Sequence, residues 1–279
     1  MTLFNHFNPT RARSIVAALG FLITGTASAA SIQTLAEAHW EGINVSDPQG
    51  PASTGQLLSS VGPNGTHANA LQNVNGLAAV AVDGAAVNGQ PGNTLLARSI
   101  WSETFTNTSG VAQSYEAVLS IPQIALFISN GRTIAQAPTT NQLMAHYAIT
   151  LDINGNTAFS STALLHSGDP GHVLVKTGTD LGGVKDPNSI KYSFAPFGGT
   201  ANLGSFAPNA SFTATYTIES GIDIPGFEVS ASAAIGDPLA IQGTGITIQP
   251  SAVPVPGAAG LLLSGVASLV AARRRRRLG

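Results

Sequence analysis

The sequence predicts an all-β protein built as an antiparallel β-sandwich, and three observations support this class. Short segments with apolar residues at every second position recur along the chain, separated by turn sequences. Glycine and proline, which favour turns, number 31 and 16 in 279 residues. No comparable amphipathic helical stretch occurs between the two ends. We expect a body of seven or more strands over residues 31–250, flanked by an N-terminal signal peptide and a single C-terminal apolar helix.

The first clear strands lie near the middle of the chain. Trp101 to Thr106 is followed by a turn sequence and then by a strand from Val111 to Ile121. In that second strand one face carries four apolar residues at alternate positions, namely Tyr115, Ala117, Leu119 and Ile121. Pro122 ends the strand, because proline cannot donate to a sheet ladder.

A β-hairpin follows. Tyr147 to Ile153 alternates with period two, and Asn154-Gly155 separates it from Thr157 to Leu165. Asn-Gly is the strongest short-range hairpin sequence, since a type I′ turn needs positive φ at both central residues. His172 to Lys176 is a further short strand.

Later strands complete the predicted sandwich. Ser211 to Glu219 places Phe212, Ala214, Tyr216 and Ile218 on one face. We expect Phe227 to Ala234 to be its neighbour and Leu239 to Ile248 to close the domain. Gly198-Gly199 is interpreted as a turn, Asn44 to Gly92 as loops with a few short strands, and Asn141 to Tyr147 as a short turn of helix.

The N-terminus has the three parts of a secretory signal peptide. Arg11 and Arg13 are the only charged residues before an apolar run from Ile15 to Ile23. The small residues that follow include Ala27, Ala29 and Ala30, and they predict cleavage after Ala29 or Ala30. The apolar run is too short for a permanent transmembrane helix. The alternative is an N-terminal core helix.

The C-terminus also has three parts, over residues 251–279. A stiff segment contains Val253, Pro254, Val255 and Pro256. Sixteen uncharged residues, 257–272, would form a helix of roughly 24 Å, somewhat short of a bilayer core of about 30 Å. Five arginines then hold that end on the cytoplasmic side: Arg273, Arg274, Arg275, Arg276 and Arg277. The alternative is a plain anchor that is never cleaved.

This tail resembles the PEP-CTERM sorting signal. The usual motif has Glu between the two prolines, and Val255 stands there in this chain, so the tail is similar to a Val-Pro-x-Pro variant. The resemblance implies processing by an exosortase-like membrane transpeptidase of a Gram-negative bacterium that makes exopolysaccharide. The stretch from Lys191 to Leu239 also resembles the body of PEP-CTERM proteins, which implies a secreted β-sandwich and no particular activity.

Charge excludes several partners. Seven of the twelve basic residues lie in the two ends, and none of the fourteen acidic ones does, so the body would carry a net charge of about −9. Nucleic-acid binding needs a basic surface, so we expect none. Electrostatic docking to anionic lipid is excluded for the same reason.

Candidate metal ligands occur in two loops, although we expect no cofactor. His166, Asp169 and His172 recur every third residue, and these side chains suit zinc or iron. Glycine and proline make this segment a turn, so the three side chains need not converge. Oxygen ligands for calcium could come from Asp180, Asp186 and Asn188. Solvated turn residues account for both patterns more simply.

Other chemistry has little support in the sequence. Neither a G-x-S-x-G elbow nor a phosphate-binding loop is present. Four aromatic residues would either stack on sugar rings or fill the core: Trp40, Trp101, Tyr115 and Tyr147. N-x-[ST] sequons begin at four asparagines and fit Asn-rich turns: Asn44, Asn64, Asn107 and Asn209.

The function expected is therefore non-enzymatic. The chain would pass through an inner-membrane intermediate and reach the cell surface or the extracellular matrix, as a structural or adhesive component of biofilm that contacts exopolysaccharide. A carbohydrate-binding module is the alternative. An extracellular hydrolase is a third hypothesis, for which no catalytic cluster is found.

Overall fold

A computed structural model of the chain describes residues 26–27, 29–40, 43–62, 66–86, 92–129, 143–168, 171–224, 229–237 and 243–251. All the regular secondary structure within these ranges is β-strand, and the strands pair antiparallel throughout. The predicted all-β class is confirmed. The predicted apolar run of the signal peptide and the C-terminal helix lie outside the described residues.

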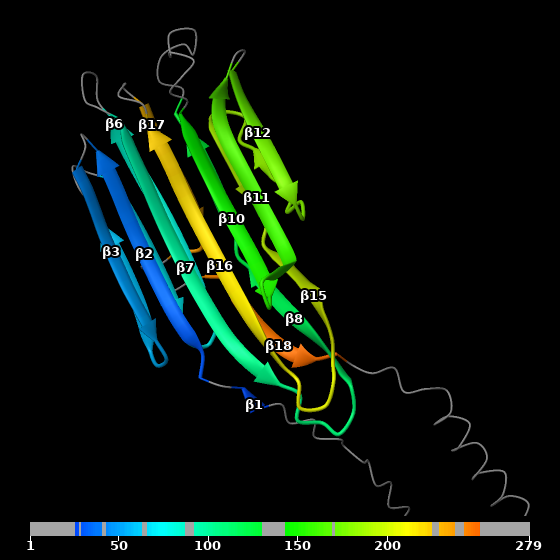
Figure 1. The fold of residues 1–279 in the computed structure, drawn as a ribbon. Coiled ribbons are helices and arrows are strands. Elements are labelled where there is room, and N and C mark those ends of the chain that lie inside the picture. The colour runs from blue at the N-terminus through cyan, green and yellow to red at the C-terminus, as the bar shows by residue number, and fades with distance from the viewer. Residues whose placement is uncertain are drawn as a thin grey trace, which may run out of the picture.

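Seven strands lie side by side in the first sheet (Figure 1). In spatial order they are β12 (Gly171–Gly178), β11 (Asn156–Gly168), β10 (Met144–Ile153), β16 (Ser211–Ile224), β7 (Asn93–Thr106), β2 (Ser31–Trp40) and β3 (Ile43–Ala52). The short β1 (Thr26–Ala27) also pairs with β7. Within the described residues this sheet therefore has eight strands, and β12 and β3 form its edges.

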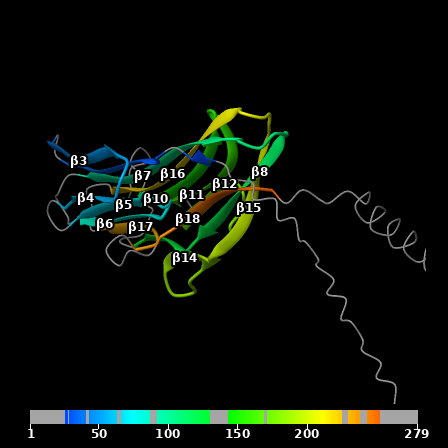
Figure 2. The ribbon, with the colours of Figure 1, turned by 90° about the horizontal axis from the view of Figure 1, so that it is seen from below.

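A second and a third sheet lie behind the first (Figure 2). The second, in spatial order, comprises β13 (Val184–Lys185), β14 (Ile190–Phe194), β9 (Ile124–Ile128), β17 (Val229–Ile235), β6 (Ala78–Ala86), β5 (His67–Asn73) and β4 (Gln56–Val61). The third comprises β15 (Phe197–Phe206), β8 (Gln113–Ile121) and β18 (Gly245–Pro250). The fold is sandwich-like, and the third sheet lies toward the end of the sandwich where β1 pairs with β7.

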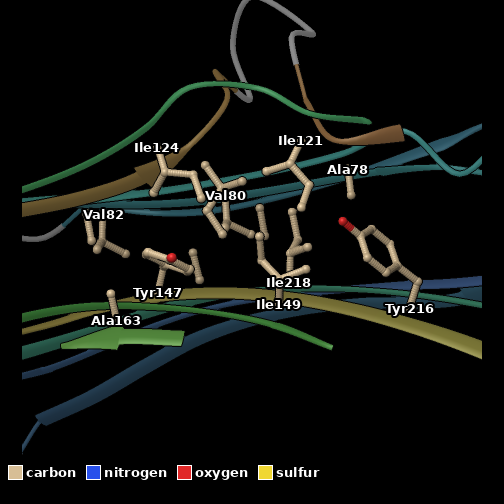
Figure 3. Packing of buried hydrophobic residues seen from close by; sticks show 14 of the residues in the cluster. Ala78, Val80, Val82, Ile121, Ile124, Tyr147, Ile149, Ala163, Tyr216 and Ile218 are labelled. Atoms are coloured by element: carbon tan, nitrogen blue, oxygen red, sulfur yellow. The ribbon is translucent and has the colours of Figure 1, made fainter. Parts of the chain in front are cut away.

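The core lies between the first and second sheets (Figure 3). The first sheet contributes Tyr147, Ile149 and Ile218 to this layer. The second sheet contributes Val80 and Ile124, and all five side chains are at most 1% exposed. Full burial of such a side chain stabilises the fold by about 1.5–3 kcal/mol. Because successive residues on a strand point to opposite sides, the other residues of each strand face outward.

Aromatic side chains join the first sheet to the third. Phe212 of β16 packs against Tyr115 of β8, with ring centroids 5.1 Å apart, and against Phe206 of β15 at 4.1 Å. Phe105 of β7 stacks on the same ring at 5.4 Å. The two predicted inward faces, Tyr115 to Ile121 and Phe212 to Ile218, are both buried as expected.

The predicted hairpin is confirmed. Asn154 and Gly155 have φ values of 50° and 80°, and they connect β10 to β11. Both values lie in the left-handed region that a type I′ turn requires. Ile121 is the last residue of β8, so that strand ends before Pro122 as predicted.

The prediction of mostly loops over Asn44 to Gly92 is wrong. This region contains β3, β4, β5 and β6, of 10, 6, 7 and 9 residues. β3 is an edge strand whose side chains are nearly all exposed, so no apolar alternation marks it. β5 and β6 lie within a sheet, and alanine, which has weak strand propensity, makes up two of the seven residues of β5 and five of the nine of β6.

Three further expectations fail. Gly198 and Gly199 lie within strand β15, opposite Ser120 and Leu119, and neither has the positive φ of a glycine turn. The Phe197 ring occupies the space that a Cβ at Gly199 would need. Residues 144–147 belong to β10 and are not helical, since buried and half-buried side chains alternate there with period two. β17 pairs with β6 and β9, because both edges of β16 are taken by β7 and β10.

Candidate functional site

The His-Asp-His segment forms the end of the β11–β12 hairpin. Ser167 pairs with His172, so these two side chains share one face of the sheet, while His166 points to the opposite face. His172 contacts the Tyr192 hydroxyl of β14 through its Nε2 at 3.3 Å, and burial, followed by the nearby Lys185 charge, lowers the pKa of His172. Asp169 lies outside the described residues. The hairpin therefore separates the two histidines instead of bringing them together.

The acidic loop after β12 is held by its own contacts. Both carboxylate oxygens of Asp180 accept hydrogen bonds from Lys176 Nζ at 2.7 Å, and these bonds lead the causes that lower the pKa of Asp180. Asp186 accepts a hydrogen bond from the backbone N–H of Asn188. Across the described ranges no cluster of three or more His, Cys, Asp or Glu is arranged to hold a metal ion.

Three of the four aromatic candidates fill the core. Trp101, Tyr115 and Tyr147 are 3%, 3% and 1% exposed, so they cannot stack on a sugar ring at the surface. Trp101 Nε1 donates a hydrogen bond to the Val74 carbonyl, and the Tyr147 hydroxyl pairs with Ser161. The side chain of Trp40 lies outside the described part of the structure.

The sequons differ in their surroundings. Asn107 is fully buried, and its amide donates to the carbonyls of Val111, Phe206 and Ala207, so it fixes a turn and offers no surface for a glycan. Asn209 has a φ of 60°, as a turn asparagine does. Asn44 is exposed on β3 and is hydrogen-bonded to His39, and Asn64 is not among the described residues.

Sequence reasoning missed an ion-pair array on the outer face of the first sheet, the face directed away from the core. Arg98 of β7 contacts Glu219 of β16 through Nη2 at 2.5 Å, and its Nε donates a hydrogen bond at 2.7 Å. His146 of β10 approaches the other carboxylate oxygen at 3.5 Å. The His146 hydrogen bond and then Arg98 lower the pKa of Glu219, although partial burial opposes them.

A groove of about 550 Å³ adjoins this array at one end of the outer face. We call it the outer-face groove. Five strands, β2, β3, β7, β10 and β16, supply its polar lining: Glu37, His39, Asn44, Ser46, Thr94, His146 and Asp223. Partial burial raises the pKa of Asp223, and a hydrogen bond from Thr94 counteracts the increase. The groove thus combines hydrogen-bond donors and acceptors suited to a polar ligand.

The other end of the sandwich holds the two ends of the described body. Ala29 and Ala30 line a cavity of about 520 Å³ together with Ile246 and Ile248 of β18. We call it the N-terminal cavity. Of the predicted cleavage residues, Ala27 pairs with Phe105, and Ala29 and Ala30 lie at this cavity. The predicted sorting residues 253–256 and arginines 273–277 are outside the described residues, which contain no helix long and apolar enough to cross a bilayer.

Comparisons with protein-family models, with curated proteins and with solved structures find no match for this chain. The resemblance of the tail to the PEP-CTERM signal therefore stays a prediction. The Arg98–Glu219–His146 array is supported by the geometry of the structure alone. Arg98 and Glu219 are 121 positions apart in the chain and are brought together by the pairing of β7 with β16.

Proposed function

We propose that this protein is exported and acts outside the cell as a structural or adhesive component of the surface or the exopolysaccharide matrix. The observation that carries the proposal is the pair of chain ends: a basic, apolar and small-residue leader at one, and a proline segment, apolar run and arginine cluster at the other. An acidic β body lies between them, and its composition opposes binding to nucleic acid.

The extent of the strands supports this division. β2 begins at Ser31, directly after the predicted cleavage residues, and β18 ends at Pro250, shortly before Val253. Because Ala29, Ala30 and β18 meet at the N-terminal cavity, both proposed processing events would act at the same end of the sandwich. Removal of both segments would take only the two-residue β1 from the first sheet and would leave every other strand in place.

The proposed processing assigns separate tasks to the parts of the tail. Arg273 to Arg277 would stop translocation on the cytoplasmic side, since guanidinium groups do not cross a bilayer. Val253, Pro254 and Pro256 would present an extended segment to an exosortase-like transpeptidase. Cleavage there would release the body from its inner-membrane intermediate.

The experiment compares tail variants of the full chain in a Gram-negative host with an exosortase-type enzyme. Alanine at Val253, Pro254 and Pro256 should leave a larger, membrane-associated form, whereas the unchanged chain yields a smaller form outside the cells. Glutamine at all five tail arginines should abolish the membrane intermediate. Lys185→Gln with Lys191→Gln is the control and should be processed normally. If both tail variants distribute like the unchanged chain, the proposal is wrong.

A second candidate function, glycan binding, is favoured by the outer face. Three consecutive cross-strand hydroxyl pairs, Ser102–Thr215, Thr104–Thr213 and Thr106–Ser211, lie 2.8–3.2 Å apart on β7 and β16. With the outer-face groove they give this sheet a polar surface that suits a polyhydroxylated chain. A glycan array tests it: saturable binding that His146→Ala weakens supports the candidate, and the absence of saturable signal contradicts it.

A further inference from the structure

Glu103 occupies an unusual position for a carboxylate. On β7, Trp101 and Phe105 face the interior, so Glu103 between them faces the same way. Partial burial raises the pKa of Glu103. No described residue donates a hydrogen bond to this carboxylate or forms an ion pair with it. A partly buried carboxylate with no cationic partner is able to accept one, since its oxygens are free for a charge-assisted hydrogen bond.

The register of β2 against β7 places the start of the body beside this side chain. Ser31 pairs with Ser102, which puts Ala30 opposite Glu103, and residues directly opposite on antiparallel strands have Cβ atoms about 4.5–5.5 Å apart. Ala27 pairs with Phe105, so the register shifts by one residue between Ala27 and Ser31. The ladder is therefore interrupted at the predicted cleavage site.

The N-terminal cavity contains both features. Ala29, Ala30 and Glu103 line it, with apolar walls from Trp101, Phe105 and Ile246. Glu103 is the sole charged group among the described residues that line it. A cation entering this cavity would meet one carboxylate in partly apolar surroundings, where a charge-assisted hydrogen bond is stronger than in water.

We propose that Glu103 binds the α-ammonium group created when the leader is removed. Hydrolysis after Ala29 or Ala30 transfers the water hydroxyl to the carbonyl carbon and a hydrogen to the nitrogen, freeing an amine at Ala30 or Ser31. With an ordinary pKa of about 7.7–8.0, that amine is protonated at neutral pH. The inference rests on the proposed export with leader cleavage, and it makes cleavage the step that completes this end of the fold.

Removal of the leader residues takes little pairing away from the body. β1 contributes two paired residues to the edge of β7, whereas β2 remains paired along ten positions with the same strand. Because the register places Ala30 opposite Glu103 and both line the N-terminal cavity, a terminal nitrogen on Ala30 would lie beside this carboxylate, and one on Ser31 would lie one residue further along β2.

The test uses chains that begin at Ala30 or at Ser31 and run to Gly279, each with a free amine or acetylated at the α-nitrogen. For at least one start, acetylation should raise the unfolding equilibrium constant about fivefold, as measured by urea denaturation. Glu103→Gln should remove that difference. Glu37→Gln, a glutamate variant on the outer face, should retain it.

A second readout does not depend on the stability of the variants. The α-amine pKa, followed by ¹⁵N NMR, should be higher in chains that retain Glu103 than in chains with the Glu103→Gln substitution. Equal denaturation midpoints for free and acetylated chains at both starts would overturn the inference, as would equal amine pKa values. These purified chains test the ion pair alone, while the N-terminus of protein recovered from culture tests leader cleavage, so the two failures are distinguishable.

Discussion

The His146 imidazole lies directly over Gly221 of the neighbouring strand. A Cβ atom at Gly221 would fall 2.3 Å from His146 Cε1, closer than any contact between such atoms allows. The absence of a side chain at Gly221 thus makes room for His146 to reach Glu219, which lies two residues before Gly221 on β16. Conformational freedom is not the reason for glycine here, since its φ is not positive.

Gly221→Ala should therefore move His146 away from Glu219. Because the partly exposed ring can turn away, the main cost is the lost contact with Glu219, about 0.5–1.5 kcal/mol of stability. Loss of the His146 hydrogen bond would raise the pKa of Glu219, measurable by ¹³C NMR of its carboxyl group. Gly198→Ala is the control, because a Cβ there meets nothing within 4 Å. An unchanged Glu219 pKa in the Gly221 variant would contradict this account.

The Arg98–Glu219–His146 array predicts a pH-dependent contribution to stability. The folded pKa of Glu219 lies below its ordinary value, so its ionised form stabilises the fold above about pH 4.5. That contribution is lost as the pH falls through the lower, folded pKa. Glu219→Gln should cost about 1 kcal/mol near pH 7 and progressively less below pH 4.5. Urea denaturation across this pH range measures it, and a pH-independent difference would refute the prediction.

Two buried tyrosines should respond differently to loss of their hydroxyls. The Tyr147 hydroxyl pairs with that of Ser161, so Tyr147→Phe should destabilise the protein by about 1 kcal/mol. The Tyr115 hydroxyl is buried and has no hydrogen-bond partner among the described residues. Tyr115→Phe should leave stability unchanged or raise it by up to about 1 kcal/mol. Thermal unfolding of the two variants side by side checks this, and equal losses would count against it.

The β11–β12 hairpin should not bind zinc through both histidines. His166 and His172 point to opposite faces, so one ion cannot contact both without disrupting the strand pairing. Calorimetric titration with zinc should show no stoichiometric uptake, and His166→Ala should change nothing. Uptake at one ion per chain that either histidine variant abolishes would show that the hairpin rearranges around a metal.

Much of the fold could be predicted because local patterns determine it. The Asn154-Gly155 turn and the alternating faces of β8, β10 and β16 need only the period of a strand and the geometry of a turn. Sequence reasoning places β17 in the wrong sheet, because adjacency in sequence does not reveal that both edges of β16 are occupied. β3 escapes prediction, since an exposed edge strand carries no apolar alternation.

The candidate sites are less predictable, for a related reason. Arg98 and Glu219 meet only through sheet register, and no local pattern links them. The aromatic candidates are ambiguous in sequence, because core filling and sugar stacking use the same residues, and burial decides for Trp101. Glu103 does break a local pattern, as a charge on the inward face of β7, and that break is visible in the sequence.

The central claim is export followed by removal of both ends, and intact mass spectrometry of the protein recovered outside the cells tests it most directly. The account predicts a chain that begins at Ala30 or Ser31 and lacks the arginines from Arg273 onward. Extracellular protein that still carries those arginines, or a chain of 279 residues found only inside the cell, would contradict it.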